Sequence, residues 1–319
     1  MGDVILVTPV LSFLRGRHPG CAIELATRPE YAGLFAQDPR VAKVWEIPRS
    51  KTPGSLFQRS YDLVVDLQNN RSSRRIRRGL GRIGDTGVFR KYHIKRLLLL
   101  AFRVDTYPRD DHVVTRYARA AGWDPSRDRE PDSPKLFPVG PEKEDSGRSR
   151  DPRVALMPFS AWKNKQWPIE NYAEVGRHFL AGGNELVLLG GPGEAGAARE
   201  LNRMLGGACR NEVGKLGVAE CSRLLRTCRL AVGNDTGLSH MARACGVPTG
   251  IVFGSTTRHL GFFPYGTPAF RVFEARRWCR PCHAHGGTTC LRGSRRCLRD
   301  ITPPAVIEGL KSLEKETRP

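Results

Sequence analysis

The stretch LAVGNDTGLSH, residues 230–240, decides the fold predicted for this chain. An apolar run, typical of a buried strand, ends in Gly-Asn-Asp-Thr-Gly and passes directly into a helical pattern. The first turn of a helix in this position presents free backbone N–H groups and a partial positive charge, which bind phosphate. Thr236 would add a hydroxyl, and Gly237 lets a phosphate approach the backbone. The alternative is that Asp235 or Thr236 only caps the helix.

The alternation of strand and helix patterns continues on both sides of this stretch. Strands are predicted at 21–27, 41–47, 61–67, 154–158, 185–191, 230–235 and 249–254, and helices at 29–37, 112–121, 168–181, 194–205, 219–227 and 238–245. Residues 138–152 are rich in Pro, Gly, Ser and charge, which is typical of a linker. Alternating strands and helices predict parallel βαβ units. The sequence therefore predicts two Rossmann-like α/β domains, residues 1–150 and 151–319, that face each other across a cleft.

The charge balance points to an anionic partner. The 319 residues include 52 Lys and Arg against 32 Asp and Glu, a net charge of +20. This excess of positive charge is compatible with nucleic acid, an acidic membrane surface or a phosphorylated small molecule as the partner, and the charge alone does not distinguish these three. The sequence has no run of about 18 apolar residues that would span a membrane. The apolar segment 4–14 lacks the basic leader and cleavage site of a secretory signal.

Several motifs together resemble a known family. KNKQWPIENY (163–172), ELVLLGGPGE (185–194) and GNDTGLSHMARACGVP (233–248), in that order, are similar to glycosyltransferase family 9, the ADP-heptose:lipopolysaccharide heptosyltransferases. Three further stretches resemble the same family: GDVILVTPVLSFLR (2–15), YDLVVDLQNN (61–70) and the C-terminal CRPC…C…CLRDITPPAVIEGL. The last of them resembles the heptosyltransferase II branch. The resemblance implies a GT-B fold and inverting transfer of heptose from ADP-heptose to the lipopolysaccharide inner core. It also implies no catalytic metal and a cytoplasmic location on the inner face of the cytoplasmic membrane.

The resemblance also assigns roles to residues. Asp3 matches the general base, although an Asp before an apolar helical run is by itself typical of a helix cap. Lys165 matches the lysine on the ADP phosphates, Glu194 the acid on the ribose, and Leu216 the apolar residue on the adenine. Asp235 is expected to accept backbone N–H bonds and hold its turn. The full predicted donor site is Ser160, Lys165, Glu194, Leu216, Asp235, Thr236, Gly237, Leu238 and His240; Ala161 lacks the hydroxyl expected beside Ser160.

The beginning of the sequence raises a separate expectation. In the family, a strand roughly ten residues long precedes the Gly2-Asp3 turn in the middle of the N-terminal sheet, and no such segment stands before Gly2 here. The residues after Asp3 then form a helix, since Val4, Val7, Leu11 and Leu14 are spaced to give one apolar face. Pro9 predicts either a kink or a helix whose first turn begins near Thr8.

The acceptor is expected to bind the first half of the chain. RSSRRIRR, residues 71–78, offers Arg71, Arg74 and Arg75 for the phosphates and carboxylates of the lipopolysaccharide core. FRKYHIKRLLLLAFR, residues 89–103, combines charge with apolar residues and is expected to rest on an anionic membrane. The alternative for these basic segments is a solvated helix face without a ligand. The alternative for the whole protein is an RNA-binding function, although the sequence shows no aromatic RNA-binding pattern.

A cluster of four cysteines stands near the end of the chain. Its spacing allows a structural zinc site, although the second pair lacks the short spacing common in four-cysteine sites. Packing thiols and a labile disulfide are the alternatives. The four residues are Cys279, Cys282, Cys290 and Cys297.

Overall fold

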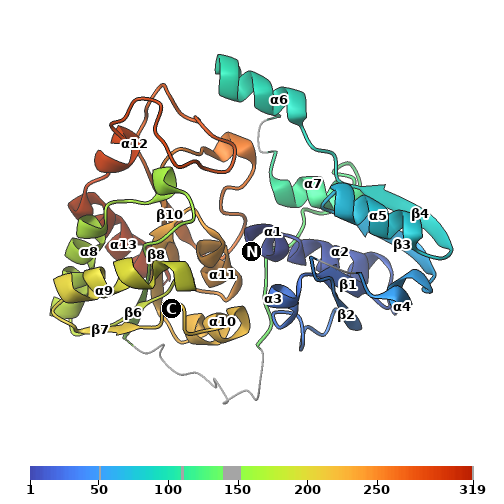
Figure 1. Cartoon of the computed structure of the whole chain (residues 1–319), viewed down its shortest axis with the longest axis horizontal. Helices are drawn as coiled ribbons and strands as arrows, with labels where there is room; N and C mark the ends of the chain where they lie inside the picture. Colours follow the sequence, from blue (N-terminus) through green and yellow to red (C-terminus); the bar gives the residue numbers. More distant parts are fainter. Residues whose placement is uncertain (50–51, 109–110, 139–151, 318–319) are drawn as a thin grey trace.

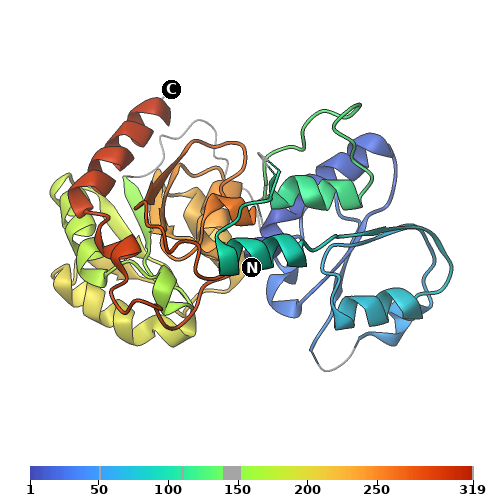
Figure 2. The same ribbon diagram turned by 90° about the horizontal axis from the view of Figure 1, so that it is seen from above.

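The computed structural model describes residues 1–49, 52–108, 111–138 and 152–317. The polypeptide forms two α/β halves that lie side by side (Figure 1). The first residues of the chain lie at the junction between the halves, and the view from above shows the same arrangement (Figure 2).

The C-terminal half is built on one parallel sheet of six strands. Its order is β10-β9-β8-β5-β6-β7, and every neighbouring pair is parallel. The strands are β5 (Arg153–Met157), β6 (Glu185–Leu188), β7 (Cys209–Asn211), β8 (Leu230–Asn234), β9 (Thr249–Phe253) and β10 (Phe270–Glu274). Parallel strands covered on both faces are continuously apolar, which explains why the strand predictions in this half succeeded.

Helices cover both faces of this sheet. One core packs α8 (Ile169–Ala181), α9 (Ala195–Met204) and α13 (Pro303–Thr317) on one face. The opposite core packs α10 (Val218–Arg226) and α11 (Gly237–Ala244) on the other face. Alternate residues of β5 enter the two cores, with Leu156 in the first and Met157 in the second. A short helix, α12 (Arg296–Arg299), precedes α13.

The N-terminal half contains two separate parallel strand pairs, β1–β2 and β3–β4. Its strands are β1 (Glu24–Thr27), β2 (Lys43–Glu46), β3 (Tyr61–Asp66) and β4 (Ile83–Val88). Its helices are α1 (Gly2–Leu6), α2 (Thr8–Arg17), α3 (Pro29–Ala32), α4 (Gly54–Phe57), α5 (Arg71–Gly79), α6 (His93–Leu97), the π-helical η1 (Leu98–Phe102) and α7 (Val113–Ala120).

The predicted α/β class with parallel strands is confirmed, and individual errors have physical causes. The helix expected at 29–37 ends at Ala32. Strand β4 was not predicted, because two glycines and an aspartate interrupt the β-branched residues of its sequence IGDTGV. A Cβ on Gly84 or Gly87 would collide with the backbone carbonyl of Asp62 or Ala120, so close neighbouring backbone requires both glycines. Strands β7 and β10 were also not predicted.

The segment after Asp3 is helical, as expected, and Pro9 lies in the first turn of α2. The prediction of one apolar face is wrong, because the two short helices lie between two cores. Ile5 and Leu11 pack with the sheet of the C-terminal half, whereas Leu6 and Val10 pack with α7. The strand expected before Gly2 lies outside the sequence and stays a prediction.

The linker expected at 138–152 falls almost entirely outside the described residues, so the boundary at 150 also stays a prediction. Within the described ranges, every helix is too short or too polar to cross a bilayer.

Candidate active site

The carboxyl ends of the six parallel strands place the predicted donor-site residues along one edge of the sheet. Reading the strand order from β9 to β7, the loops contain Thr256, Asp235, Ser160, Glu194 and Leu216 in turn. This edge is where ligands bind in open parallel sheets. The fold therefore arranges in space, as one row, residues that are far apart in the sequence.

Asn234, at the end of β8, joins two of these loops. Its side chain is fully buried, and its Oδ1 accepts hydrogen bonds from the Trp167 backbone N–H at 3.0 Å and the Tyr172 hydroxyl at 3.1 Å. Its Nδ2 donates to the Pro158 carbonyl at 2.7 Å. The amide thus fixes the loop after β5, which includes Lys165, against the turn after β8.

Lys165 and Asp235 form a buried ion pair with an Nζ–Oδ2 distance of 2.6 Å. Thr256 donates its hydroxyl to the same Oδ2 at 2.7 Å, and Lys165 Nζ also donates to the Asp235 carbonyl at 3.2 Å. Asp235 was expected to accept backbone N–H bonds. In the described part of the chain its carboxylate accepts from these two side chains instead, so that expectation is wrong. The carboxylate holds the turn by orienting the lysine rather than by capping α11.

Thr236 is the N-cap residue of α11, with extended backbone and no capping bond from its side chain. Its hydroxyl is buried and has no hydrogen-bond partner among the described residues. A buried hydroxyl without a partner is costly unless a ligand or water satisfies it. This geometry rules out simple capping by Thr236 and leaves its hydroxyl and the first N–H groups of α11 available to an anion.

The N-terminal half contacts this turn directly. A Cβ on Gly237 would approach Met1 Cβ to 2.7 Å, and a Cβ on Gly2 would approach His240 Cδ2 to 3.3 Å. The close approach at Gly237 is therefore made by α1, which packs on α11. Burial lowers the pKa of His240 to about 4, so its imidazole is neutral at pH 7.

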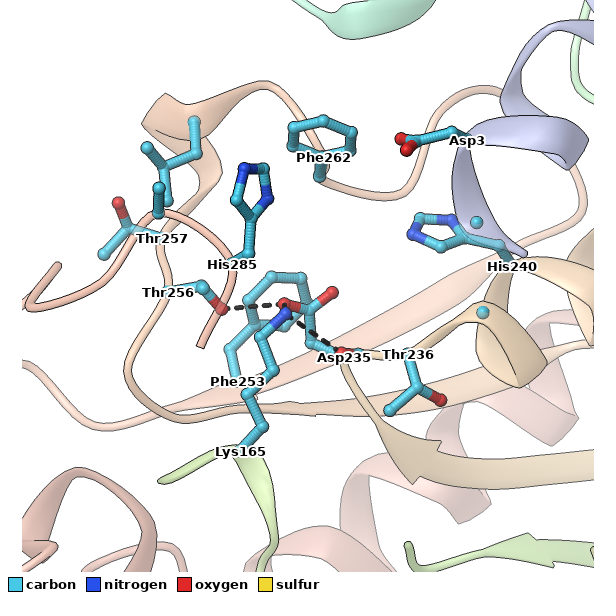
Figure 3. A pocket seen from close by; sticks show the side chains of 14 residues that line it. Asp3, Lys165, Asp235, Thr236, His240, Phe253, Thr256, Thr257, Phe262 and His285 are labelled. Atoms are coloured by element: carbon cyan, nitrogen blue, oxygen red, sulfur yellow. Dashed lines mark hydrogen bonds and ion pairs between the residues drawn. The ribbon is translucent and has the colours of Figure 1, made fainter. Parts of the chain in front are cut away.

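Asp3 lies in the first turn of α1 and forms no capping bond, so the capping alternative is not supported. Its exposed carboxylate faces the pocket from the N-terminal half (Figure 3). Behind it, burial and then the charge of Asp3 raise the pKa of Tyr117.

These groups line one pocket of about 150 Å³ between the halves. Its wall includes Gly2, Asp3, Lys165, Asp235, Thr236, Gly237, His240, Thr256, Thr257, Phe262 and His285 (Figure 3). Pockets for whole cofactors usually measure about 300–1,000 Å³. The volume is therefore suited to the reacting groups of a ligand, with the remainder lying along the sheet edge.

The other predicted donor residues lie outside this pocket. Ser160 is buried, and its Oγ accepts from the Trp162 backbone N–H at 3.2 Å. Glu194 Oε2 accepts from Gly191 N–H at 2.7 Å, and burial raises the pKa of this carboxyl. Leu216 and Leu238 are half-buried against the core under α10 and α11.

The predicted acceptor residues are not brought to the pocket. Arg71, Arg74 and Arg75 lie on α5, which Figure 1 places on the far side of the N-terminal half from the junction. All three are exposed, and Arg74 Nε donates to Asn69 Oδ1 at 2.9 Å. Their assignment to the acceptor stays a prediction.

The four clustered cysteines lie near one another: burial and then the charges of Cys297, Cys279 and Cys290 raise the pKa of Cys282 to about 11. Cys279, Cys282 and Cys290 line a common pocket, and Cys297 is buried nearby in α12. All nine cysteines are free thiols, so the disulfide alternative is not seen. Among the described side chains, no group of three or more could hold a metal ion. The expected zinc site therefore stays a prediction.

Some pocket residues were missed by the sequence reasoning. Thr256 and Thr257 follow β9 in FGSTT, a small polar turn of the same kind as GNDTG, and this similarity was the available signal. His285 and Phe262, whose rings meet edge to face with centroids 6.0 Å apart, come from irregular loops. No local pattern marks them.

Comparison with known proteins identifies the family of this chain. The model of glycosyltransferase family 9 (heptosyltransferase) matches residues 49–289. The lipooligosaccharide heptosyltransferase 2 of Haemophilus influenzae is 24% identical over 98% of this chain and 96% of that protein. The structure of the E. coli ADP-heptose lps heptosyltransferase II aligns with a TM-score of 0.71 and 22% identity, over 99% of this chain and 96% of that chain. A glycosyltransferase family 9 structure from Veillonella parvula aligns with a TM-score of 0.78 and 19% identity, over 99% and 95%.

The fold is that of the GT-B glycosyltransferases. The chain belongs to glycosyltransferase family 9, as the sequence motifs predicted, and it is an enzyme that transfers a glycosyl group.

Proposed function

We propose that this enzyme transfers heptose from ADP-heptose to the inner core of lipopolysaccharide, with inversion at the sugar carbon. The curated relatives are lipopolysaccharide or lipooligosaccharide heptosyltransferases, and one solved neighbour is described with ADP-2-deoxy-2-fluoro heptose. The single observation that supports the mechanism is the meeting of Asp3 with Lys165 and Thr236 around one pocket.

Asp3 is the proposed general base. Inverting transfer needs a group that takes the proton of the acceptor hydroxyl on the side opposite the leaving diphosphate. Asp3 comes from the N-terminal half, whereas the groups able to neutralise a leaving group come from the C-terminal half. An acceptor between them would be deprotonated on one side while the sugar–phosphate bond breaks on the other.

The diphosphate is proposed to bind the first turn of α11 and Lys165. The unpartnered hydroxyl of Thr236, the N–H groups of that turn and the lysine ammonium would stabilise the charge that develops on the departing ADP. Glu194 and Leu216, further along the sheet edge, would contact the ribose and the adenine. Asp235 keeps the lysine in place through the 2.6 Å ion pair.

The acceptor and the location belong to the same proposal. A lipid-linked, phosphorylated and carboxylated acceptor suits the +20 net charge. The enzyme is proposed to work in the cytoplasm at the inner face of the cytoplasmic membrane, with Arg71, Arg74 and Arg75 available to the anionic core.

The test is Asp3→Asn, assayed for heptose transfer and for ADP binding by calorimetry. Transfer should fall by about 10²–10⁴-fold, the usual contribution of a general base, while ADP affinity stays within about twofold. Glu30→Gln, which removes an exposed acid from the first turn of α3, is the matched control and should leave transfer unchanged. Full activity of Asp3→Asn would exclude Asp3 as the base.

A panel of nucleotide sugars tests the donor separately. ADP-heptose should be the preferred donor; preference for another sugar nucleotide would keep the transferase and change its substrate. Binding of single-stranded RNA in place of any nucleotide sugar would support the nucleic-acid alternative.

A further inference from the structure

An unusual surface lies where α6 and η1 meet the loop that joins β10 to α12. Most large apolar side chains of the described chain are buried, but here five are 60–78% exposed. They come from both halves of the molecule: Ile94, Leu97, Phe102, Trp278 and Leu291. We call these five residues and the basic residues around them the apolar-basic face.

The two parts of this face are adjacent. Arg103, directly after η1, lines one pocket together with Trp278, Leu291 and Arg292 from the loop. Figure 1 shows α6 and this loop at the same upper edge, and Figure 2 shows α6 lying across the junction of the halves. The exposed residues therefore form one surface that spans both halves.

The helix exposes its apolar residues in a regular stripe. Ile94 and Leu97 are three positions apart and Ala101 follows four later, so all three lie on one side of the helix and all are exposed. Leu99, on another side, is buried. An amphipathic helix with its apolar side in solvent is typical of a segment that lies in the interface of a bilayer.

The charge of the face is predominantly positive, with acidic residues at its margins, where Asp300 pairs with Arg277 and Arg296. Segments 88–104 and 275–299 contain twelve Arg and Lys residues and no Asp or Glu. Several of the basic residues pair with nearby groups, such as Arg280 with Glu274 at 2.8 Å and Arg292 with the Trp278 ring at 4.0 Å. Arg90 and Lys91 are exposed beside the stripe.

From this combination we infer that the apolar-basic face docks on an anionic lipid bilayer, with both halves of the enzyme in contact with the same membrane. Aliphatic side chains gain free energy by entering the acyl region, while the surrounding cations attract acidic headgroups. RNA would satisfy the charges but gives exposed Ile and Leu no apolar environment. A symmetric contact between two copies would place the same acid-free basic segments against each other.

The inference deepens the proposed function, on which it rests for the lipid-linked nature of the acceptor. The loop that exposes Trp278 and Leu291 also places His285 in the catalytic pocket. Docking would therefore hold the membrane beside a loop that lines the reaction site, so that an acceptor in the bilayer meets the cleft.

The test is sedimentation of the full chain with vesicles of phosphatidylethanolamine and phosphatidylglycerol, compared with vesicles of phosphatidylcholine alone. Wild type should sediment with the anionic vesicles only. Arg90→Glu with Lys91→Glu should weaken binding at least about 25-fold, since each basic residue near an anionic surface contributes about fivefold. Leu97→Ser with Phe102→Ser should weaken it about tenfold or more, because partly buried apolar area is lost.

A matched control distinguishes the contribution of the apolar-basic face to vesicle binding from the effect of the protein's net charge. Arg199→Glu with Arg203→Glu makes the same charge change on exposed positions of α9, which lies at the lower left in Figure 1, away from α6, and should weaken binding less than about threefold. Equal losses for the two charge reversals would overturn the inference, as would full binding by Leu97→Ser with Phe102→Ser. RNA binding without vesicle binding would also overturn the inference. An oligomer of the wild type that dissociates in Leu97→Ser with Phe102→Ser would overturn it as well.

A second assay distinguishes this inference from the proposed function. With a delipidated, water-soluble acceptor, Leu97→Ser with Phe102→Ser should transfer heptose at the wild-type rate. Vesicle binding without any transfer would contradict the proposed function alone, and transfer without vesicle binding would contradict the docking alone.

Discussion

Replacing Asn234 with alanine should strongly destabilise the C-terminal half. The substitution removes the partner of three buried groups: the Trp167 N–H, the Tyr172 hydroxyl and the Pro158 carbonyl. A buried polar group without a partner costs about 1–3 kcal/mol, and a water entering the vacated space recovers part of it. The expected loss in the free energy of unfolding is therefore about 3–5 kcal/mol.

Urea unfolding followed by circular dichroism, with ADP absent, measures this loss. Tyr172→Phe is the matched control, because it removes one hydrogen bond and leaves Asn234 bonded to Trp167; it should cost about 1 kcal/mol. Asn234→Ala should also bind ADP more weakly, because the loop that contains Lys165 loses the hydrogen bonds that fix its position. A loss below about 1 kcal/mol for Asn234→Ala would refute the reasoning that this amide joins the two loops.

Three further predictions use other parts of the structure. Lys165→Ala should lower kcat/KM about 10²-fold by removing the cation that faces the leaving diphosphate, and unchanged steady-state kinetics would reduce the residue to a surface charge. Burial lowers the pKa of His112 to about 3 and of His240 to about 4, against an ordinary value of 6.5. Between these lowered pKa values and pH 6.5, the unfolded chain therefore binds more protons than the folded protein. The free energy of unfolding should accordingly fall by about 3 kcal/mol or more as the pH is lowered from 7 to 4, and a flat urea-unfolding profile would contradict the buried neutral imidazoles. If Cys279, Cys282, Cys290 and Cys297 are zinc ligands, protein purified without chelator should contain about one equivalent of zinc that is lost from a Cys282→Ser variant; metal analysis that shows no zinc would leave the four thiols as packing residues.

The sequence predicted the four central strands of the C-terminal half, β5, β6, β8 and β9, because they are apolar, whereas the terminal strands β7 (CRN) and β10 (FRVFE) contain charged residues and were missed. The helices that were predicted, α8 to α11, have clear boundaries, whereas α12 and α13 were not predicted. Pro168 precedes α8, and the GNDTG turn precedes α11. The local strand–turn–helix pattern indicated Thr236, whereas Lys165 was assigned only by the resemblance to the family. The N-terminal half was harder, since β4 depends on glycines whose need is visible only when the neighbouring backbone is known.

The pairing of residues across the site was beyond sequence reasoning. The bond from Thr256 to Asp235 and the approach of His285 depend on loops that only the completed fold brings together. The role of Asp235 was misjudged for this reason: backbone N–H groups follow it in the sequence, but a lysine 70 residues earlier reaches it first in space.

The order of loops along the sheet edge has a consequence for how donor preference can change. Neighbouring strands lie about 4.8 Å apart, so the four steps from the loop after β9 to the loop after β7 measure about 19 Å. In the proposed binding mode, the diphosphate would lie at the turn after β8, the ribose at the loop after β6 and the base at the loop after β7. These contacts would then come from separate loops, each attached to its own strand. A relative could therefore change its preference for the base by substitutions in the loop after β7, while the turn after β8 keeps its sequence.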